Sequence, residues 1–268
     1  MYKTADFIMG QFPGLRRFLN RIFYQYLAGL DATGKVKLMN YGYASATGKI
    51  PLQPQDEPDR CSLQLYHRVA SAIDLNGRDV LEVGSGRGGG ASYIMRYLKP
   101  RTMTGMDYSS KAVAFCQRHY ADVEGLQYRP GDAEDMPFEA NSFDVVVNVE
   151  SSHCYGSMEN FVNEAGRVLR PGGYFLWTDH RPPQDLSGVY ALFERCGFEI
   201  QERQSITENV LAALDYQRER NRALIDDNVP PIGRHIFYSF AGVEGTLIHD
   251  RFRNGELEYV RLVMRKAT

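Results

Sequence analysis

Several features that would place this chain in a specialised class of protein are absent from its sequence. Four cysteines are present, but they form no C-x-x-C pair and show no metal-ligand spacing, so we expect neither a disulfide framework nor a zinc site. Unpaired thiols of this kind indicate a cytoplasmic protein. No apolar run reaches the length of a membrane span, and the N-terminus lacks the apolar core and small-residue cleavage site of a signal peptide.

An excess of charge of one sign is also lacking. The net charge at pH 7 is −2, which gives no electrostatic reason to expect a nucleic-acid partner. No internal repeat or low-complexity tract interrupts the 268 residues. A chain of this length can bury one substantial core, so we expect one elaborated domain.

A glycine-rich stretch is the most informative part of the sequence. Residues 80–83 predict a short buried strand, the glycines after it predict a turn, and residues 91–98 begin a helix. This arrangement directs backbone N–H groups and a helix N-terminus at a ligand, and glycine allows both positive φ and a close approach. Gly84, Gly86 and Gly89 also fit G-x-G-x-x-G, so the loop alone does not separate a dinucleotide site from other cofactor sites.

Further strands alternate with helices along the chain. Thr102–Asp107 predicts a second strand whose last residue lies 21 positions after Gly86 (107 − 86), where an acid accepts hydrogen bonds from a ribose diol. Phe143–Glu150 is nearly all apolar, as expected of a strand buried on both faces. Such β/α units between residues 79 and 179 indicate an α/β fold with a doubly wound, mostly parallel sheet. Because ligands bind outside the carboxyl ends of such strands, the polar residues there should share one rim.

The C-terminal third continues this pattern. We expect a helix over residues 186–196, a strand over 198–203, a long charged helix over 207–227 and a final strand over 257–265. The turn Arg253–Glu256 predicts a hairpin connection before that last strand. The chain between the last two strands is therefore an insertion placed to cover a substrate pocket.

These motifs form an ordered set over about residues 60–180. Together they resemble the class I S-adenosylmethionine (SAM)-dependent methyltransferases: E-x-G-x-G-x-G from Glu82, the strand-two Asp107, G-D-A-E-x-x-P-F from Gly131, F-D-V-V from Phe143 and V-L-R-P-G-G-Y from Val168. Four segments are more closely similar to the phthiotriol/phenolphthiotriol dimycocerosate and polyketide-tailoring O-methyltransferases: Leu65–Arg68, Gly88–Tyr93, Val149–Tyr155 and Phe240–Thr246. The resemblance implies SAM as cofactor and O-methylation of a hydroxyl on a polyketide, lipid or other secondary metabolite. The partner would then be an apolar, hydroxylated small molecule.

The resemblance also implies a domain organisation. Residues 59–268 would form a Rossmann-like methyltransferase domain, with a seven-stranded sheet that ends in an antiparallel pair and a cap insertion over 206–250. Residues 1–58 would supply an N-terminal helical lid and a loop. Apolar residues recur at helical spacing through residues 1–30, which fits a lid over a lipid-like substrate, a membrane-surface helix or an ordinary helix packed on the core. Peripheral membrane contact and a homodimer therefore stay open.

Two residues on the predicted rim are candidates for catalysis. Methyl transfer from a sulfonium is an in-line displacement, and an alcohol is a poor nucleophile at neutral pH, so a positioned base helps. We expect His153, just past the fourth strand, to be this general base, because imidazole titrates near working pH; the alternative is a cap on the next helix. Asp179, after the fifth strand, would orient His153 or bind the acceptor hydroxyl, or else only cap a turn. His180 should point to the opposite side from Asp179, and because the spacing of these residues shows no metal signature, we assign no metal.

The resemblance assigns further positions to the cofactor. Gly84 and Gly86 would receive the methionine part, Asp107 the ribose hydroxyls and Asp132 the adenine amine. Tyr43, on a glycine-containing loop, would close over the methionine end or else serve only in packing. The complete set of cofactor-binding candidates is Glu82, Gly84, Ser85, Gly86, Met106, Asp107, Tyr108, Asp132, Ala133, Asn148 and Tyr43.

Other functions remain open on the sequence alone. A NAD(P)-dependent Rossmann oxidoreductase fits the glycine loop and Asp107, although no Y-x-x-x-K dyad follows the fourth strand. C- or N-methylation would need a different acceptor, and amine acceptors often need no base. A SAM-binding protein without catalysis would leave His153 without a role.

Overall fold

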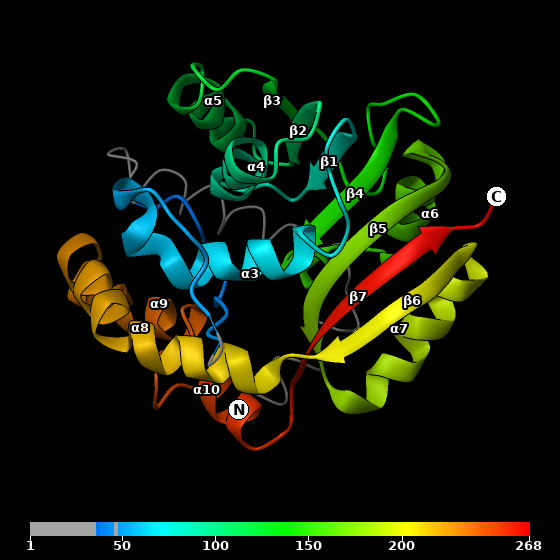
Figure 1. The fold of residues 1–268 in the computed structure, drawn as a ribbon. Coiled ribbons are helices and arrows are strands. Elements are labelled where there is room, and N and C mark those ends of the chain that lie inside the picture. Colours follow the sequence, from blue (N-terminus) through cyan, green and yellow to red (C-terminus); the bar gives the residue numbers. More distant parts are fainter. Residues whose placement is uncertain (1–35, 46–47) are drawn as a thin grey trace.

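A seven-stranded sheet forms the centre of the molecule (Figure 1). The computed structural model describes residues 36–45 and 48–268, so the helical lid expected within residues 1–30 lies outside the described residues. The strand order is β3-β2-β1-β4-β5-β7-β6, and only the pairs that involve β7 are antiparallel within this sheet. The strands are β1 (Asp79–Val83), β2 (Thr102–Asp107), β3 (Leu126–Pro130), β4 (Phe143–Val149), β5 (Leu169–Arg181), β6 (Phe198–Ser205) and β7 (Glu258–Lys266). This confirms the expected doubly wound, mostly parallel sheet.

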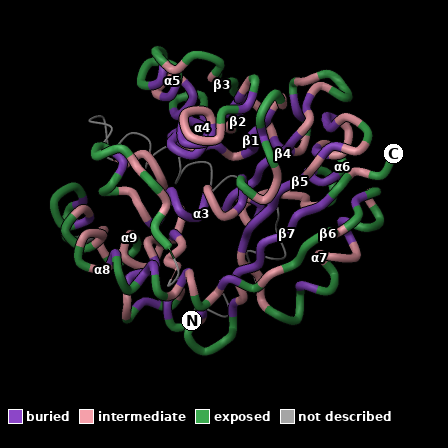
Figure 2. The backbone as a smooth tube through the Cα atoms, in the orientation of Figure 1, coloured by how far each residue is buried: buried purple, intermediate pink, exposed green. Residues whose placement is uncertain are grey.

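The central strands are buried on both faces, which explains their continuous apolar sequence (Figure 2). In β4, Val145 and Val147 point to one face and Val146 to the other, as a period of two requires. The first face is covered by α3 (Arg60–Ala70), α4 (Gly89–Tyr93) and α5 (Ser110–His119). The second face is covered by α6 (Met158–Val168) and α7 (Pro183–Arg195). Four shorter helical segments are also present in the described residues: the 3₁₀ helices η1 (Pro54–Asp59), η3 (Ser152–Cys154) and η4 (Pro231–Gly233), and the π-helix η2 (Ile94–Leu98).

Three helices occupy the chain between β6 and β7, as expected of an insertion before the last strand (Figure 1). They are α8 (Thr207–Asn228), α9 (Arg234–Phe240) and α10 (Leu247–Arg253), and they pack against one another. We call this group of helices the cap. Across the described ranges, no helix is both long enough and apolar enough to cross a membrane.

The turn at Arg253–Glu256 ends α10, so the prediction of a hairpin connection there was wrong. Gly255 takes a φ of +72°, and its N–H donates to the carbonyl of Phe252. A glycine in this conformation is typical of the end of a helix. A glycine turn shows that the chain reverses, but it does not show which kind of element precedes the reversal.

Strand β5 extends beyond the apolar run that predicted it. It pairs with β7 from Tyr174 to Arg181. Asp179 therefore lies inside the strand and not after it, opposite Val260. The prediction of its position was wrong because the end of β5 is set by a strand 81 positions later (260 − 179).

Candidate active site

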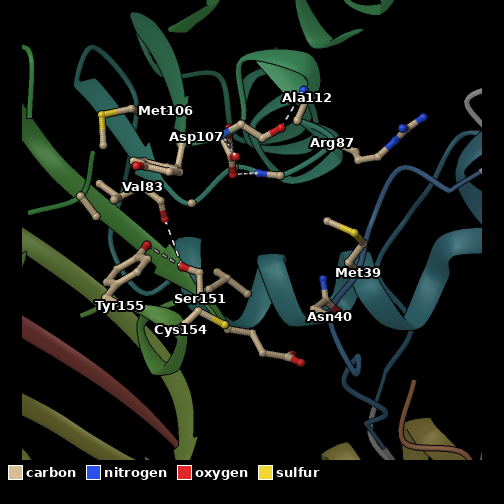
Figure 3. A pocket seen from close by; sticks show the side chains of 18 of the residues that line it. Met39, Asn40, Val83, Arg87, Met106, Asp107, Ala112, Ser151, Cys154 and Tyr155 are labelled. Atoms are coloured by element: carbon tan, nitrogen blue, oxygen red, sulfur yellow. Dashed lines mark hydrogen bonds between the residues drawn. The ribbon is translucent and has the colours of Figure 1, made fainter. Parts of the chain in front are cut away.

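A large cavity lies at the carboxyl ends of β1, β2 and β4 (Figure 3). It contains about 1280 Å³ of space not filled by atoms, part of it open to solvent. We call it the rim cavity. Its lining residues include Leu38, Met39, Asn40, Tyr66, Gly84, Ser85, Gly86, Arg87, Met106, Asp107, Tyr108, Asp132, Ala133, Glu150, Ser151, Cys154 and Tyr155.

The glycine loop after β1 is crowded on both sides. Gly84 has a φ of +79°, and a Cβ there would come within 2.4 Å of the Ser151 Oγ. Gly86 has a φ of +52°, and a Cβ there would lie 3.0 Å from the Met39 Cε. Gly84 therefore needs glycine for both the backbone conformation and the space, whereas Gly86 needs it for the backbone conformation, since the end of Met39 can move.

The backbone N–H groups of this loop are used by the protein itself. Gly84 and Ser85 donate to the carbonyl of Met106 at 2.8 and 2.9 Å, and Gly86 donates to Asp107 Oδ2 at 2.8 Å. This corrects the expectation that these N–H groups face a ligand. It also disfavours a NAD(P) site, because a dinucleotide pyrophosphate is held by such amides.

Asp107 links this loop to the next helix. One carboxylate oxygen accepts from Gly86, and the other accepts from the Ser109 N–H at 2.8 Å, just before α5 begins. Met106 and Tyr108 line the cavity on either side of it in the sequence. A carboxylate with apolar and aromatic neighbours suits the ribose and adenine of an adenosine cofactor.

Most of the expected cofactor residues come together here. Eight of them line the rim cavity: Gly84, Ser85, Gly86, Met106, Asp107, Tyr108, Asp132 and Ala133. Glu82 and Asn148 are buried behind the loop: Glu82 accepts from the Tyr66 hydroxyl at 2.7 Å, and Asn148 Nδ2 donates to the Val83 carbonyl at 2.8 Å. These two residues support the loop from beneath and are not part of the cavity wall.

Tyr43 does not line the rim cavity, which corrects that expectation. Its N–H donates to the Cys61 carbonyl at 2.9 Å, and its own carbonyl accepts from Gln64 Nε2 at 2.8 Å, so its backbone is fixed on α3. Met39 and Asn40 stand at the wall instead. The sequence could not show this, because a loop has no periodicity from which the direction of its side chains can be read.

Residues 36–45 run as a strap between the sheet and the cap. The carbonyl of Tyr41 accepts from Gln217 Nε2 of α8 at 3.2 Å. Ala44 donates to the carbonyl of Asn209 at 3.0 Å and accepts from its Nδ2 at 2.8 Å. The strap is therefore hydrogen-bonded to α8 as well as to the core.

His153 and Asp179 form a hydrogen-bonded pair on the same rim. His153 Nδ1 lies 2.8 Å from Asp179 Oδ1, and the His153 N–H donates to Asp179 Oδ2 at 2.9 Å. Asp179 is fully buried, which opposes its charge, but Arg181 and His153 hold its pKa well below the usual range. Burial lowers the pKa of His153, whose side chain is 28% exposed, yet Cys154 and Asp179 outweigh burial and raise this pKa well above its usual value. His153 does not line the rim cavity itself, whereas its neighbour Cys154 does.

His180 lies against His153, although adjacent side chains of a strand point to opposite sides. The two ring centroids are 4.6 Å apart, and the His180 N–H donates to Asp179 Oδ1 at 2.8 Å. Burial, assisted by the nearby His153, lowers the pKa of His180 to about 3, so this ring is neutral. Alternation applies to side chains within one strand. His153 lies in a different element, so it can contact both Asp179 and His180 of β5.

These three side chains also raise the question of a metal ion. Their ligand atoms lie within 4.8 Å of one another. Protein groups already contact both carboxylate oxygens of Asp179. Oδ2 accepts from Ser152 Oγ at 2.6 Å and from the His153 N–H, and Arg181 Nη1 lies 3.1 Å from it. Oδ1 is bound by His153 Nδ1 and by the His180 N–H. We therefore assign no metal to this group.

Glu150 also belongs to this site, although its sequence position alone did not predict it. It lines the rim cavity and has a φ of +51°, which is strained for a residue with a side chain. Its Oε2 accepts from the Tyr41 N–H at 2.9 Å and from the Tyr259 hydroxyl at 2.8 Å. Burial raises the pKa of Glu150 to about 8. The available signal was an acidic residue directly after the apolar run of β4.

Residues 81–177 match the family model described as "Methyltransferase domain". The matched segment runs from β1 into β5, so it contains the glycine loop, Asp107 and His153. Together with the relatives described in the next paragraph, this match shows that the chain is a SAM-dependent methyltransferase, and SAM is its cofactor. The oxidoreductase alternative is thereby set aside.

The chain belongs to the family of the phthiotriol/phenolphthiotriol dimycocerosates methyltransferases. It is 40% identical to the protein of that name from Mycobacterium tuberculosis over 240 residues, which cover 89% of this chain and 88% of the relative. It is 39% identical to the fatty-acid O-methyltransferase of Mycolicibacterium smegmatis, over 89% of this chain and 86% of that protein.

Solved structures share the fold at low identity. The [4+2]-cyclase SpnF superposes with a TM-score of 0.72 at 19% identity, covering 94% of this chain and 96% of that one. A geranyl diphosphate methyltransferase in complex with GPP and sinefungin superposes with a TM-score of 0.65 at 16% identity, covering 93% and 99%. These likenesses support the architecture alone.

Asp107→Asn should weaken binding of S-adenosylhomocysteine about 10- to 100-fold, the range for loss of hydrogen bonds to a charged group. The amide would set an N–H donor against the N–H of Gly86 or Ser109 and would loosen the loop. Titration calorimetry measures the affinity, with the exposed Asp122→Asn as control. An unchanged affinity in Asp107→Asn would remove this carboxylate from the cofactor site.

Glu150→Gln should flatten the dependence of stability on pH. The carboxyl has a usual pKa of 4.5 and a pKa of about 8 in the folded protein, so folding binds a proton between these values and stability falls as pH rises from about 5 to 8. Glutamine cannot ionise, so the melting temperature of the Glu150→Gln protein should fall less over this pH range than that of the parent. Circular dichroism at pH 5 to 9 measures this, and the exposed Glu139→Gln should keep the parent slope. If Glu150→Gln kept that slope as well, the ionisation would belong to another group.

Proposed function

We propose that this methyltransferase transfers the methyl group of SAM to a hydroxyl oxygen of a lipid or polyketide acceptor, with His153 as general base. The hydrogen-bonded pair of His153 and Asp179 is the observation that carries this proposal. The acceptor class is supported by the names of the relatives, which refer to phthiotriol dimycocerosates and to fatty acids.

The pair has the arrangement that a general base requires. In the neutral form of His153, with Nδ1–H donated to the buried Asp179, the lone pair is on Nε2, where it can take the hydroxyl proton. Asp179 fixes this tautomer and stabilises the imidazolium that forms. When bound, SAM supplies the electrophilic methyl group. The proton moves from the acceptor oxygen to Nε2 as the oxygen attacks.

A hydroxyl acceptor is favoured over the alternatives by the need for a base. A fatty-acid carboxylate is already ionised at neutral pH, and amine acceptors often need no base. Neither would require a histidine held by a buried carboxylate. A C-methylation would need a carbon nucleophile, and we place it second.

We extend the proposal to the organisation of the chain. Residues 59–268 are the methyltransferase domain, residues 206–250 act as a cap over the acceptor, and residues 1–58 supply the lid and loop. All four cysteines are free thiols, which suits the reducing cytoplasm. The protein would bind its apolar acceptor in the cytoplasm. Alternatively, it would take the acceptor from a membrane surface through a peripheral contact.

His153→Ala should lower kcat about 10²- to 10⁴-fold, the usual contribution of a positioned general base. Affinity for S-adenosylhomocysteine should change less than about threefold, because His153 does not line the rim cavity. Uptake of a labelled methyl group into hydroxylated lipids measures the rate, and calorimetry measures the affinity. Full turnover by His153→Ala would contradict the assignment of the base.

Asp179→Asn should move the acidic limb of the pH–rate profile to lower pH. Only neutral His153 accepts a proton, so kcat/KM should rise with pH through the pKa of this residue, which Asp179 helps to raise. Removing the carboxylate charge lowers that pKa and also disturbs the tautomer, so the plateau rate should fall as well. A profile of the same shape and midpoint as the parent's would show that Asp179 does not act through His153.

A further inference from the structure

A second cavity lies between the strap and the cap. It contains about 1140 Å³ of space not filled by atoms, part of it open to solvent. We call it the cap cavity. Its walls come from the strap, from the end of η1 and the start of α3, and from α8 and α9 with the residue that follows α9.

The two cavities share a wall. Leu38, Met39 and Asn40 of the strap line both cavities, and so does Arg87 of the glycine loop. Among the described residues, these shared side chains therefore lie between the cap cavity and the rim cavity.

The lining of the cap cavity on the side of α8 and α9 is largely apolar. Leu224, Ile225, Val229, Phe237 and Phe240 contribute aliphatic and aromatic surface. Such walls accept a hydrocarbon chain and offer little to a polar one.

Three polar groups in the same lining, Asp59, Gln217 and Arg220, are engaged with one another or with the backbone. Arg220 Nη2 lies 2.6 Å from Asp59 Oδ1. Gln217 Nε2 donates to the carbonyls of Tyr41 and Ala213 at 3.2 Å each. These groups therefore present neither an uncompensated charge nor an open amide to a ligand, which favours an apolar occupant.

We propose that the cap cavity holds the hydrocarbon chain of the acceptor and thereby selects acceptors by chain length. This inference rests on the proposed function only for the reactive hydroxyl of the ligand. The binding of its hydrocarbon chain does not depend on that function. The chain would lie against α8 and α9, and the head group would cross the shared wall at Leu38–Asn40. From there the strap leads to Tyr41, whose ring lies 5.8 Å from that of His180, beside the catalytic pair.

The test is the dependence of binding on chain length, which does not require turnover. Straight-chain primary alcohols of six to twelve carbons are titrated into the full-length protein with S-adenosylhomocysteine bound. Each methylene that enters an apolar cavity should tighten binding about fourfold until the cavity is full. A parent protein that binds all lengths equally would overturn the proposal.

Two alanine-to-tryptophan variants make the test specific. Ala241 lines the cap cavity, whereas Ala223 is an exposed residue of α8 outside it. Ala241→Trp should fill the cavity, so the gain per methylene should stop at a shorter chain and the longest alcohols should lose about tenfold or more in affinity. Ala223→Trp should behave as the parent does.

A third variant guards against misfolding of the first. Phe240→Ala enlarges the same cavity and should move the plateau to longer chains. Affinity for S-adenosylhomocysteine, measured in each variant, reports an intact rim cavity. If both cavity variants keep the parent's dependence on chain length, the cap cavity is empty or holds another part of the chain, and the proposal falls.

Methyl transfer to the same alcohols separates this inference from the proposed function. Binding that depends on chain length, without any methyl transfer to a hydroxyl, would retain the chain site and overturn the proposed acceptor chemistry. Methyl transfer that is indifferent to chain length and to Ala241→Trp would retain the chemistry and overturn the chain site.

Discussion

A fully buried carboxylate determines the geometry of the rim around His153. A charge in the interior is tolerated only when each of its oxygens is hydrogen-bonded. Asp179 meets this condition by accepting from Ser152 and His153 in η3, just after β4, and from His180 in its own strand. Arg181 balances the charge. The need to satisfy one buried group therefore joins two strands and leaves His153 with one orientation and one tautomer.

The strap links the rim to the cap through hydrogen bonds. Tyr41 donates its N–H to Glu150 at the end of β4 and accepts a bond from Gln217 in the cap. Residues 38–40 then separate the rim cavity from the cap cavity. The rim cavity, the His153–Asp179 pair and the cap cavity thus all lie beside one short segment of chain. A displacement of the strap would therefore alter all three.

Much of the fold was predictable because its signals are local. Strands buried on both faces are apolar throughout, as β4 is, and the glycine loop stands where strand gives way to helix. The predictions that were wrong concern features whose structure depends on residues far away in the chain or on the neighbouring element. The end of β5 depends on β7, the direction of Tyr43 depends on α3, and the turn at Arg253–Glu256 belongs to α10.

Local sequence signals were enough to predict the doubly wound sheet, the glycine loop and the positions of Asp107 and His153 at strand ends, because periodicity and turn chemistry act over a few residues. The assembled structure added that the loop amides bind β2 and that His180 lies beside His153. It also placed strained Glu150 under the strap. Such contacts join groups that lie 21 to 109 positions apart in the chain, and their geometry follows from how buried polar groups satisfy one another once the strands have assembled.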